Sequence, residues 1–408
     1  MKKFSSILII FVLIATGFAF AIKNKNSSEA EIYPVKRVYA TVDLAATLMD
    51  CVGVMRLAPT DASRFYGYSL LASDLGYNNS KGENRQQVSA VAGALTALGL
   101  VQAPKVKREM RAFLERQLVV VGDNNYNQGK AISEKILKIA NFDGYDVMQE
   151  RVTPEILIKT PLPQDYYWAP TGTGDGPLDP KFVRVTPLFS SSTECILPEP
   201  NAEDIRREAE ELFSSFNPED AVGKDVLWWL AGTGTATPTG YWLRMANFYI
   251  GDNQLDAAKA SRLLAMIAVT NFDTAIQLWN NKYAYNVARP ETMWKVLYGA
   301  SVDKLPRDTP NHPSYPSGHS GFSQSAADVI TSELGNVSLR DVLPPDLYAT
   351  SWKMIWSTPQ DAVNEASRSR INSGFHYPMD TQGGQDLGAC VAKGAIAGYD
   401  DLLKELSK

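Results

Sequence analysis

Apolar residues recur at intervals of three and four along most of the chain, the spacing that places side chains on one face of an α-helix. The pattern begins near residue 39 and is clearest in residues 42–57 (VDLAATLMDCVGVMRL), 62–75, 88–101 and 132–142. No convincing run alternates apolar and polar residues as a half-exposed strand would. The pattern therefore predicts an all-α protein built of packed helical bundles.

Residues 160–201 interrupt the helical pattern because they are rich in proline, glycine and aromatic residues. A loop of this length in a compact protein usually lines the entrance of a site or marks a domain junction. Asn201 then has the place of an N-cap before a charged amphipathic helix. We expect an N-terminal helical region over 39–215 and a catalytic helical bundle over 216–408, with helical stretches near 255–285, 319–334, 359–371 and 381–406.

The first 21 residues have the pattern of a signal peptide: two lysines, an apolar run from Ile7 to about Phe20, and a small residue on each side of Phe20. The alternative is an uncleaved anchor, but the run is shorter than the ~20 apolar residues of a membrane-spanning helix. Residues 22–38 are polar and are expected to form a flexible leader. The sequence thus predicts a periplasmic or secreted protein with no stable membrane span in the mature chain.

Composition narrows the class of partner. The net charge of −5 and the pI near 5.5 give no long-range attraction for nucleic acid or acidic membranes, so anion chemistry requires a local cationic cluster. Cys51, Cys195 and Cys390 allow at most one disulfide, and their wide spacing suits neither a zinc site nor a redox pair. Buried free thiols are the favoured interpretation, and the oligomeric state stays open.

Two cations lie close together in residues 279–294 (WNNKYAYNVARPETMW). Lys282 and Arg289 are seven positions apart, nearly two helical turns, so their side chains share a face if the helix persists. Arg289 precedes Pro290, which favours a place at a helix end. Taken alone, the pair also fits a solvated basic face.

A second stretch, residues 313–320 (PSYPSGHS), precedes a segment with helical periodicity. Ser317 and Gly318 therefore stand where a helix begins with unpaired backbone amides, a place that favours anions. The alternative is that Ser317 only caps the helix and that His319 is a surface residue of the first turn.

A third stretch, residues 367–380 (SRSRINSGFHYPMD), holds Arg370, His376 and Asp380. Asp380 follows His376 by four positions, so its carboxylate can hydrogen-bond the ring and fix its tautomer, although Asp380 also fits a simple N-cap. Arg368 is two positions from Arg370 and would point away on a helix. Together the three stretches supply three cations, a helix N-terminus and two histidines, the parts needed to surround an oxyanion.

In this combination and order, Lys282-x6-Arg289-Pro290, Pro316-Ser317-Gly318-His319 and Ser369-Arg370-x5-His376-x3-Asp380 resemble the three-part signature of the superfamily of type 2 phosphatidic acid phosphatases and vanadium-dependent haloperoxidases. Residues 63–77 and 168–188 are more loosely similar to the N-terminal half of its bacterial haloperoxidase-like members, so the resemblance extends over most of the mature chain. The fold it implies is helical bundles.

The resemblance implies a vanadate site in which His376 supplies the apical V–N bond and is oriented by Asp380. His319 would be the acid/base, and Lys282 would help to activate peroxide. The remaining ligands of the vanadate oxygens would be Lys282, Arg289, Arg370, Ser317 and the Gly318 amide. Phosphate is expected to fit the same site, because bound vanadate has the geometry of a phosphoryl group in transfer.

Two residues favour the haloperoxidase within this superfamily. Trp279 lies one helical turn before Lys282, where haloperoxidases commonly carry an aromatic residue. His312 matches the pattern of members that oxidise bromide and iodide rather than chloride. The alternatives are a core tryptophan and a polar loop residue.

The favoured function is therefore oxidation of a halide by hydrogen peroxide to hypohalous acid, with small organic acceptors as further partners. The first alternative is an exported soluble acid phosphatase that acts on small phosphate esters through a phosphohistidine at His376. The second is a noncatalytic phosphate-binding protein, which would leave His319 and His376 without a task.

Overall fold

A computed structural model describes residues 39–82, 84–117, 123–145, 161–171, 176–299, 309–343 and 352–408. Within these ranges the expected all-α fold is confirmed. The α-helices are α2 (Ala40–Met55), α3 (Pro59–Asn78), α4 (Asn84–Leu100), α5 (Pro104–Gln117), α6 (Asp123–Asn141), α7 (Ala202–Ser215), α8 (Lys224–Trp228), α9 (Thr237–Asn253), α10 (Ala257–Tyr285), α11 (Pro290–Tyr298), α12 (Gly318–Leu334), α13 (Pro359–Asn372) and α14 (Pro378–Ser407). Short 3₁₀ helices are η3 (Gln164–Tyr166), η4 (Pro180–Arg184), η5 (Ser190–Glu194) and η6 (Asp220–Val222).

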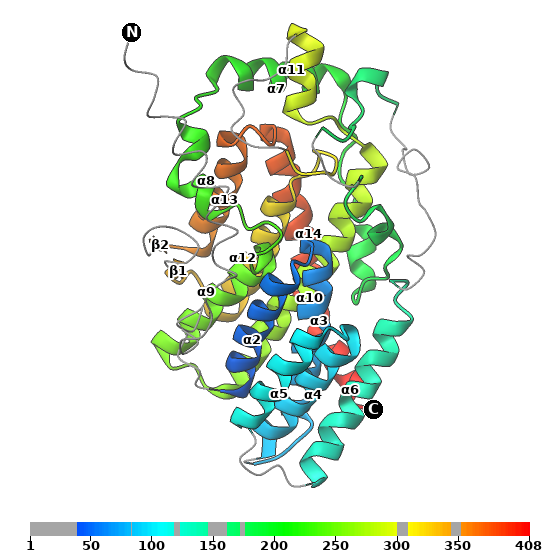
Figure 1. The fold of residues 1–408 in the computed structure, drawn as a ribbon, viewed down its shortest axis with the longest axis vertical. Coiled ribbons are helices and arrows are strands. Elements are labelled where there is room, and N and C mark those ends of the chain that lie inside the picture. Colours follow the sequence, from blue (N-terminus) through cyan, green and yellow to red (C-terminus); the bar gives the residue numbers. More distant parts are fainter. Residues whose placement is uncertain are drawn as a thin grey trace. The chain divides into compact units, whose positions relative to one another are not determined.

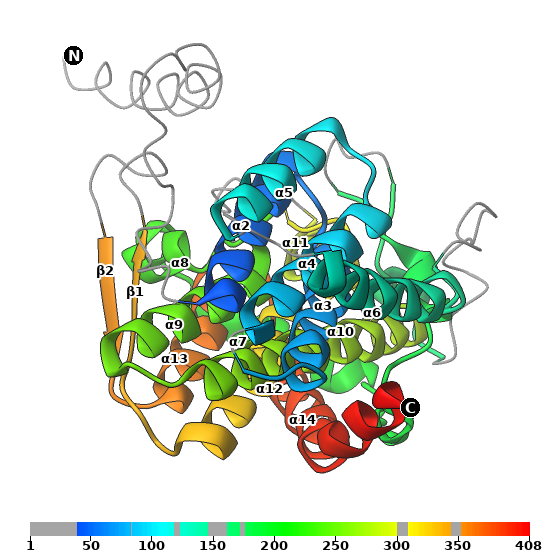
Figure 2. The same cartoon turned by 90° about the horizontal axis from the view of Figure 1, so that it is seen from below.

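Two units are distinguished by their internal contacts, and the helices all belong to the larger one, Val35–Arg340 with Ile355–Lys408. Within it, the central helix α10 packs against α3 on one side and against α12 and α14 on another. Helices α2, α4 and α6 pack against α3, and α5 packs against α2 and α4. Helix α13 packs against α12 (Figures 1 and 2). Because α10 touches both groups, its side chains can face either bundle.

Helix boundaries in the second half follow the sequence signals closely. Helix α10 begins after Asp256, whose side chain accepts a hydrogen bond from the Lys259 amide. Helix α13 begins after Thr358, which forms a capping box with Asp361. The four stretches expected near 255–285, 319–334, 359–371 and 381–406 are thus helices α10, α12, α13 and α14.

One element lies outside the all-helical expectation. Strands β1 (Leu339–Leu343) and β2 (Trp352–Trp356) form a two-stranded sheet. Exposure alternates along β2 until its last residue, but a five-residue strand is too short for its period to stand out in the sequence.

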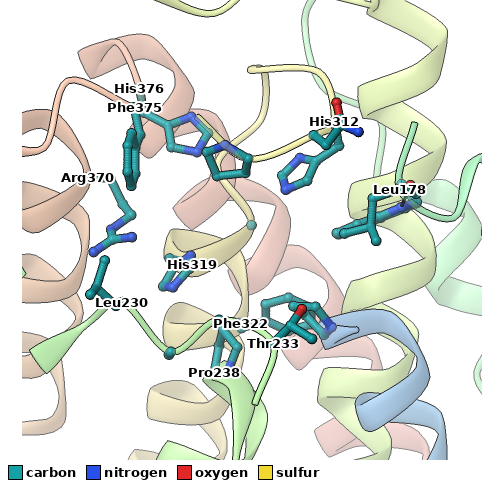
Figure 3. A pocket seen from close by; sticks show the side chains of 17 residues that line it. Leu178, Leu230, Thr233, Pro238, His312, His319, Phe322, Arg370, Phe375 and His376 are labelled. Carbon is teal, nitrogen blue, oxygen red and sulfur yellow. Dashed lines mark hydrogen bonds between the residues drawn. The ribbon is translucent and has the colours of Figure 1, made fainter. Parts of the chain in front are cut away.

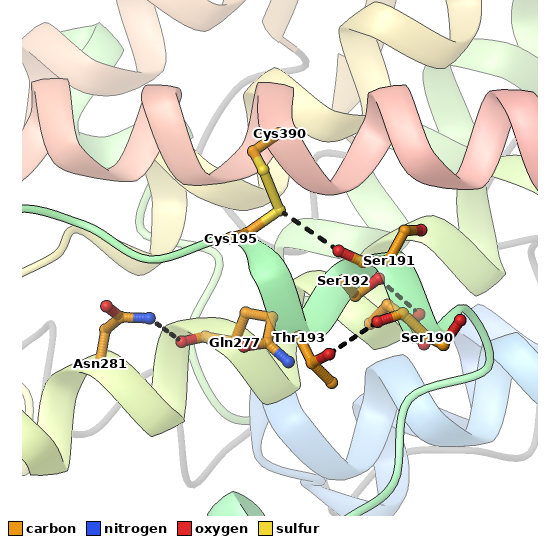
Figure 4. The surroundings of a disulfide bond; sticks show 9 residues. Ser190, Ser191, Ser192, Thr193, Cys195, Gln277, Asn281 and Cys390 are labelled. Carbon is orange, nitrogen blue, oxygen red and sulfur yellow. Dashed lines mark hydrogen bonds between the residues drawn. A yellow bond between two sulfur atoms is a disulfide. The ribbon is translucent and has the colours of Figure 1, made fainter.

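The described part of the Pro/Gly-rich loop is fixed to two helices. Asp273 of α10 accepts hydrogen bonds from the amides of Leu188 (2.7 Å) and Phe189 (2.8 Å) and from the Ser192 hydroxyl (2.8 Å). A disulfide then joins Cys195 to Cys390 of α14 (Figure 4).

This disulfide corrects the expectation of buried free thiols, which holds only for Cys51. The two half-cystines are 195 positions apart. Their spacing carried no signal because the fold alone brings them together.

Residues 1–21, the expected signal peptide, and 22–38, the expected leader, lie outside the described residues. The domain boundary near residue 215 stays a prediction. Among the helices that the structure describes, none combines the length and the apolar character needed to cross a bilayer.

Candidate active site

The first cationic stretch is bent, not continuous. Helix α10 ends at Tyr285 because Asn286 has a left-handed backbone conformation (φ 50°), and Arg289 is then the N-cap of α11. The helix does not persist from Lys282 to Arg289, so the condition for a shared helical face is not met, and Arg289 lies at a helix end as Pro290 indicated. Both side chains are nevertheless fully buried and converge, since each donates to the 312–314 segment.

The 313–317 turn lies between these cations and helix α14. Lys282 Nζ donates to the carbonyl oxygens of Pro313 (2.8 Å) and Ser314 (2.9 Å). The Ser317 amide donates to the Asp380 carbonyl oxygen at 2.8 Å. Ser317 is also the N-cap of α12, because its hydroxyl oxygen accepts from the Ser320 amide at 3.4 Å. The cap is thus observed, but His319, a surface residue in that alternative, lies in the first helical turn with its Nε2 buried and lines a cavity.

Asp380 fixes the third stretch. Its Oδ2 accepts from His376 Nδ1 (2.8 Å), the Ser314 hydroxyl (2.5 Å) and the Tyr377 amide (3.1 Å). Asp380 is the third residue of α14 in a capping box, so the simple N-cap alternative is wrong: the N-cap is Tyr377. Burial raises the pKa of Asp380 to about 6, which leaves the carboxylate ionised at neutral pH.

The Asp380 contact assigns the tautomer of His376. A carboxylate accepts, so the ring proton is on Nδ1 and Nε2 carries a lone pair. Arg289 Nη1 donates to this nitrogen at 3.0 Å and to the Phe375 carbonyl oxygen at 2.9 Å. His376 Nε2 is therefore a buried, unprotonated nitrogen that accepts from Arg289 here and would serve as a ligand or nucleophile once Arg289 donates to a bound oxyanion instead.

Arg289 assigns His312 in the same way. Its Nη2 lies 3.1 Å from His312 Nδ1, and a guanidinium only donates, so Nδ1 is the acceptor and Nε2 carries the proton. This excludes donation from Nδ1 to the Pro313 carbonyl, which lies farther away at 3.3 Å. The His312 ring also packs on Trp279, with 5.1 Å between the ring centroids.

In His319 the ring nitrogen without a hydrogen-bond partner among the described residues is Nε2. The Leu230 carbonyl hydrogen-bonds the ring, while Nε2 is buried and has no hydrogen-bond partner among the described residues. The proton is accordingly on Nδ1, and Nε2 is a free base. Burial lowers the pKa of His312, His319 and His376 well below the usual histidine value, and nearby cations lower it further.

The pKa values of Arg289 and Lys282 are both lowered, but to different degrees. Burial lowers the pKa of Arg289 to about 10, so it stays charged at neutral pH. Burial and the neighbouring Arg289 lower the pKa of Lys282 well below its usual range. An oxyanion bound beside Lys282 would favour its charged form again.

A cavity of about 270 Å³ opens onto this cluster. The rings of His376, His312 and His319 lie around one space, with Arg370 and Leu230 on one side and Leu178 on another (Figure 3). Of the residues predicted from the sequence, those that line the cavity are Trp279, His312, Gly318, His319, Arg370 and His376. Lys282, Arg289, Ser317 and Asp380 are buried close to these residues but are not in the lining.

The sequence motifs did not predict several residues of the cavity wall: Pro59, Leu230, Ala231, Gly232, Thr233, Pro238, Pro310, Asn311, Phe322 and Phe375. Phe322 and Phe375 lie beside the motifs, whereas the 230–233 segment carries no pattern that distinguishes it. Leu178 comes from the Pro/Gly-rich loop, which was expected to line a site entrance.

The donor set fits a tetrahedral oxyanion such as vanadate or phosphate. His376 Nε2 offers a lone pair, and Arg289, Arg370 and Lys282 supply charge. His319 Nε2 is a buried polar atom that lacks a partner among the described residues. At Gly318 an added Cβ would have its nearest contact at 3.9 Å, on Phe322, so the backbone can be approached closely.

Comparisons with known proteins bear on the family of part of the chain and on its fold. Residues 300–405 match the family model of the VCPO second helical-bundle domain, which includes the His319 and His376 stretches but not Lys282 and Arg289. A comparison with curated proteins finds no match.

Similar solved structures cover nearly the whole chain. The first bacterial vanadium-dependent iodoperoxidase has a TM-score of 0.74 and 19% identity over 91% of this chain and 98% of its own. The holo-type bacterial vanadium-dependent chloroperoxidase has a TM-score of 0.64 and 13% identity over 86% of this chain and 94% of its own. The apo-type chloroperoxidase has a TM-score of 0.65 and 13% identity, over 86% and 95%.

Proposed function

We propose that this chain, which has the fold of the vanadium-dependent haloperoxidases and matches their second helical-bundle domain over residues 300–405, is a vanadate-dependent haloperoxidase. It oxidises a halide with hydrogen peroxide to hypohalous acid. The observation that carries the proposal is His376: Asp380, at 2.8 Å, holds the ring proton on Nδ1, so the lone pair lies on Nε2, and His376 lines the buried cavity beside Arg289.

His376 Nε2 would hold vanadate, and the oxygens would be bound by Lys282, Arg289, Arg370, the Ser317 hydroxyl and the Gly318 amide. Bound vanadate supplies a Lewis acid that activates peroxide toward the halide. The side chains then have separate tasks. The cations stabilise negative charge in a cavity with little water, where such interactions are strong.

His319 moves the proton. Its free Nε2 accepts a proton from hydrogen peroxide entering the cavity and returns it to the departing oxygen. The Leu230 carbonyl keeps the other ring nitrogen protonated, so the base is ready before peroxide arrives. Lys282, buried close to the cavity lining, adds charge as the oxygen leaves.

Halide selection is assigned to His312 and Trp279. The Arg289 contact places the His312 proton on Nε2, so this ring can donate to an anion while Trp279 provides a polarisable face. A donor of this kind suits bromide and iodide, which give up their hydration more easily than chloride. We therefore assign the chain a preference for bromide or iodide.

Export is also part of the proposal. The Cys195–Cys390 disulfide supports an oxidising compartment, in agreement with the signal-peptide pattern of residues 1–21. N-terminal sequencing of the native protein should find a chain that begins near Ile22. An intact N-terminus recovered with membranes would contradict export by cleavage.

One experiment separates the proposal from its alternatives. Purified apo-protein is assayed with vanadate, peroxide and each halide, and separately with phosphate esters in the absence of vanadate. The His376→Ala variant should lose both vanadate binding and halide oxidation. Ester hydrolysis without halide oxidation would favour the phosphatase, since the same Nε2 can attack phosphorus. Phosphate binding with neither activity would favour a binding protein.

A further inference from the structure

The walls of the cavity differ in character from the oxyanion site at its end. Away from the histidines and Arg370, the cavity is bounded mainly by carbon: Pro59, Leu178, Leu230, Ala231, Pro238, Trp279, Phe322 and Phe375. Peroxide is small and hydrophilic, and of these walls the proposed function gives only Trp279 to the halide, so neither reactant accounts for the others. The apolar part of the cavity therefore favours a ligand with an apolar surface.

The cavity volume is large enough for an apolar ligand. The cavity measures about 270 Å³. A cavity of roughly 150 Å³ lined by apolar side chains accepts a benzene molecule, and one water has a share of about 30 Å³ in the liquid. Vanadate, peroxide and a halide would take up part of this volume, and the remainder is on the scale of a single six-membered ring.

Polar atoms in the lining specify a hydrogen-bond donor on that ring. Asn311 donates through Nδ2 to the Gly176 carbonyl, which fixes the amide, and its Oδ1 is buried without a partner among the described residues. His319 Nε2 is assigned to peroxide, so Asn311 Oδ1 is the acceptor that is left for the ring substituent. The cavity therefore offers an acceptor and an aromatic surface together, and a phenol supplies both the hydroxyl and the ring.

We infer that the cavity binds the organic acceptor itself, a single-ring phenol, so that the halogen is transferred inside the protein. The inference rests on the proposed function, which supplies peroxide and halide. The balance is X⁻ + H₂O₂ + Ar–H → Ar–X + OH⁻ + H₂O. The O–O bond breaks, peroxide takes two electrons from the halide, and a C–X bond replaces a C–H bond whose proton ends in water.

Gly232 gives access to a test, because it lines the cavity and an added Cβ would meet only the Leu230 carbonyl oxygen, at 3.8 Å. Gly232→Phe should fill space in the cavity. Gly232→Ala is the matched control, since it makes the same loss of glycine without adding a ring.

The first measurement is equilibrium binding of phenol to the protein by ligand-observed NMR, without halide or peroxide. Gly232→Phe should weaken phenol binding at least about tenfold, whereas Gly232→Ala should stay near wild type. Equal binding by all three proteins, or no binding by wild type, overturns the inference even if halide oxidation is intact.

The second measurement is the ortho-to-para ratio of bromophenols made by the vanadate-loaded protein from phenol, bromide and peroxide. Wild type should give a ratio different from that of reagent hypobromous acid, and Gly232→Phe should return it to the reagent value. Because a product ratio does not depend on turnover rate, a slow variant remains informative. A wild-type ratio equal to the reagent's refutes transfer in the cavity while leaving halide oxidation standing. Absence of any bromide oxidation would instead count against the proposed function.

Discussion

Replacing Arg370 by alanine tests whether the cavity binds an oxyanion through charge. Arg370 is 2% exposed and lines the cavity. A hydrogen bond to a charged group contributes about 1.5–3 kcal/mol, so losing one to a bound oxyanion should raise the vanadate Kd about 10- to 150-fold. A full Coulomb interaction at ~4 Å and an effective dielectric of 20 would be about 4 kcal/mol, which sets an upper limit.

Arg368→Ala is the control because Arg368 lies on the same helix, α13, and is exposed. The assay is calorimetric titration of each apo-protein with vanadate at one pH and ionic strength. Arg368→Ala should leave the Kd within about twofold of wild type, since exposed charges contribute little. Equal losses in the two variants would mean that long-range charge, not the placement of Arg370, attracts the anion.

A structural loss must be separated from a binding loss. Arg370 also donates to the Ser369 hydroxyl (3.1 Å) and to the Val226 carbonyl (3.4 Å). The free energy of unfolding of each variant is therefore measured without vanadate. A weaker Kd in an Arg370→Ala protein that unfolds at wild-type denaturant concentrations supports the site.

Four further results are expected. His312→Ala should change halide oxidation and halide preference while vanadate affinity stays near wild type, as judged by steady-state kinetics beside vanadate titration; unchanged kinetics would make His312 a loop residue only. Phosphate should compete with vanadate during reconstitution, so the apparent vanadate Kd should rise linearly with phosphate concentration, and indifference to phosphate would contradict a site that selects charge and shape. Cys195→Ser should lower the free energy of unfolding by about 2–5 kcal/mol, measured by urea denaturation, because the disulfide closes a loop between residues 195 positions apart; a reductant should leave the variant unchanged. Burial, and then the charge of Asp179, raises the pKa of Asp61 to about 7, above its value in an unfolded chain, so the folded protein binds the extra proton and the free energy of unfolding should fall as pH rises from about 4 to about 7; Asp61→Asn should flatten the slope in this same pH range, and an unchanged slope would refute the assignment.

The sequence predicts one end of the cavity well. Gly318, His319, Arg370 and His376 stand in short motifs beside helix ends, where proline, glycine and capping residues fix the local backbone. Local signals of this kind are set within a few residues and so can be predicted without the fold.

The other walls depend on the fold. Pro59 comes from α3, Leu178 from the Pro/Gly-rich loop and Ala231 from the segment before α9, and none has neighbours that mark it. The sequence left open whether one helix runs from Lys282 to Arg289, because the left-handed turn at Asn286 has no unambiguous sequence signature. Tertiary packing decides both features.

The disulfide has a topological consequence. Residues 195 to 390 form one covalent ring, and every candidate site residue, from Trp279 to Asp380, lies within it. A single peptide-bond cleavage anywhere inside this ring leaves both pieces joined through Cys195 and Cys390. The oxyanion ligands therefore stay in one molecule after a nick, whereas helices α2 to α6 precede the ring and have no such bond to it.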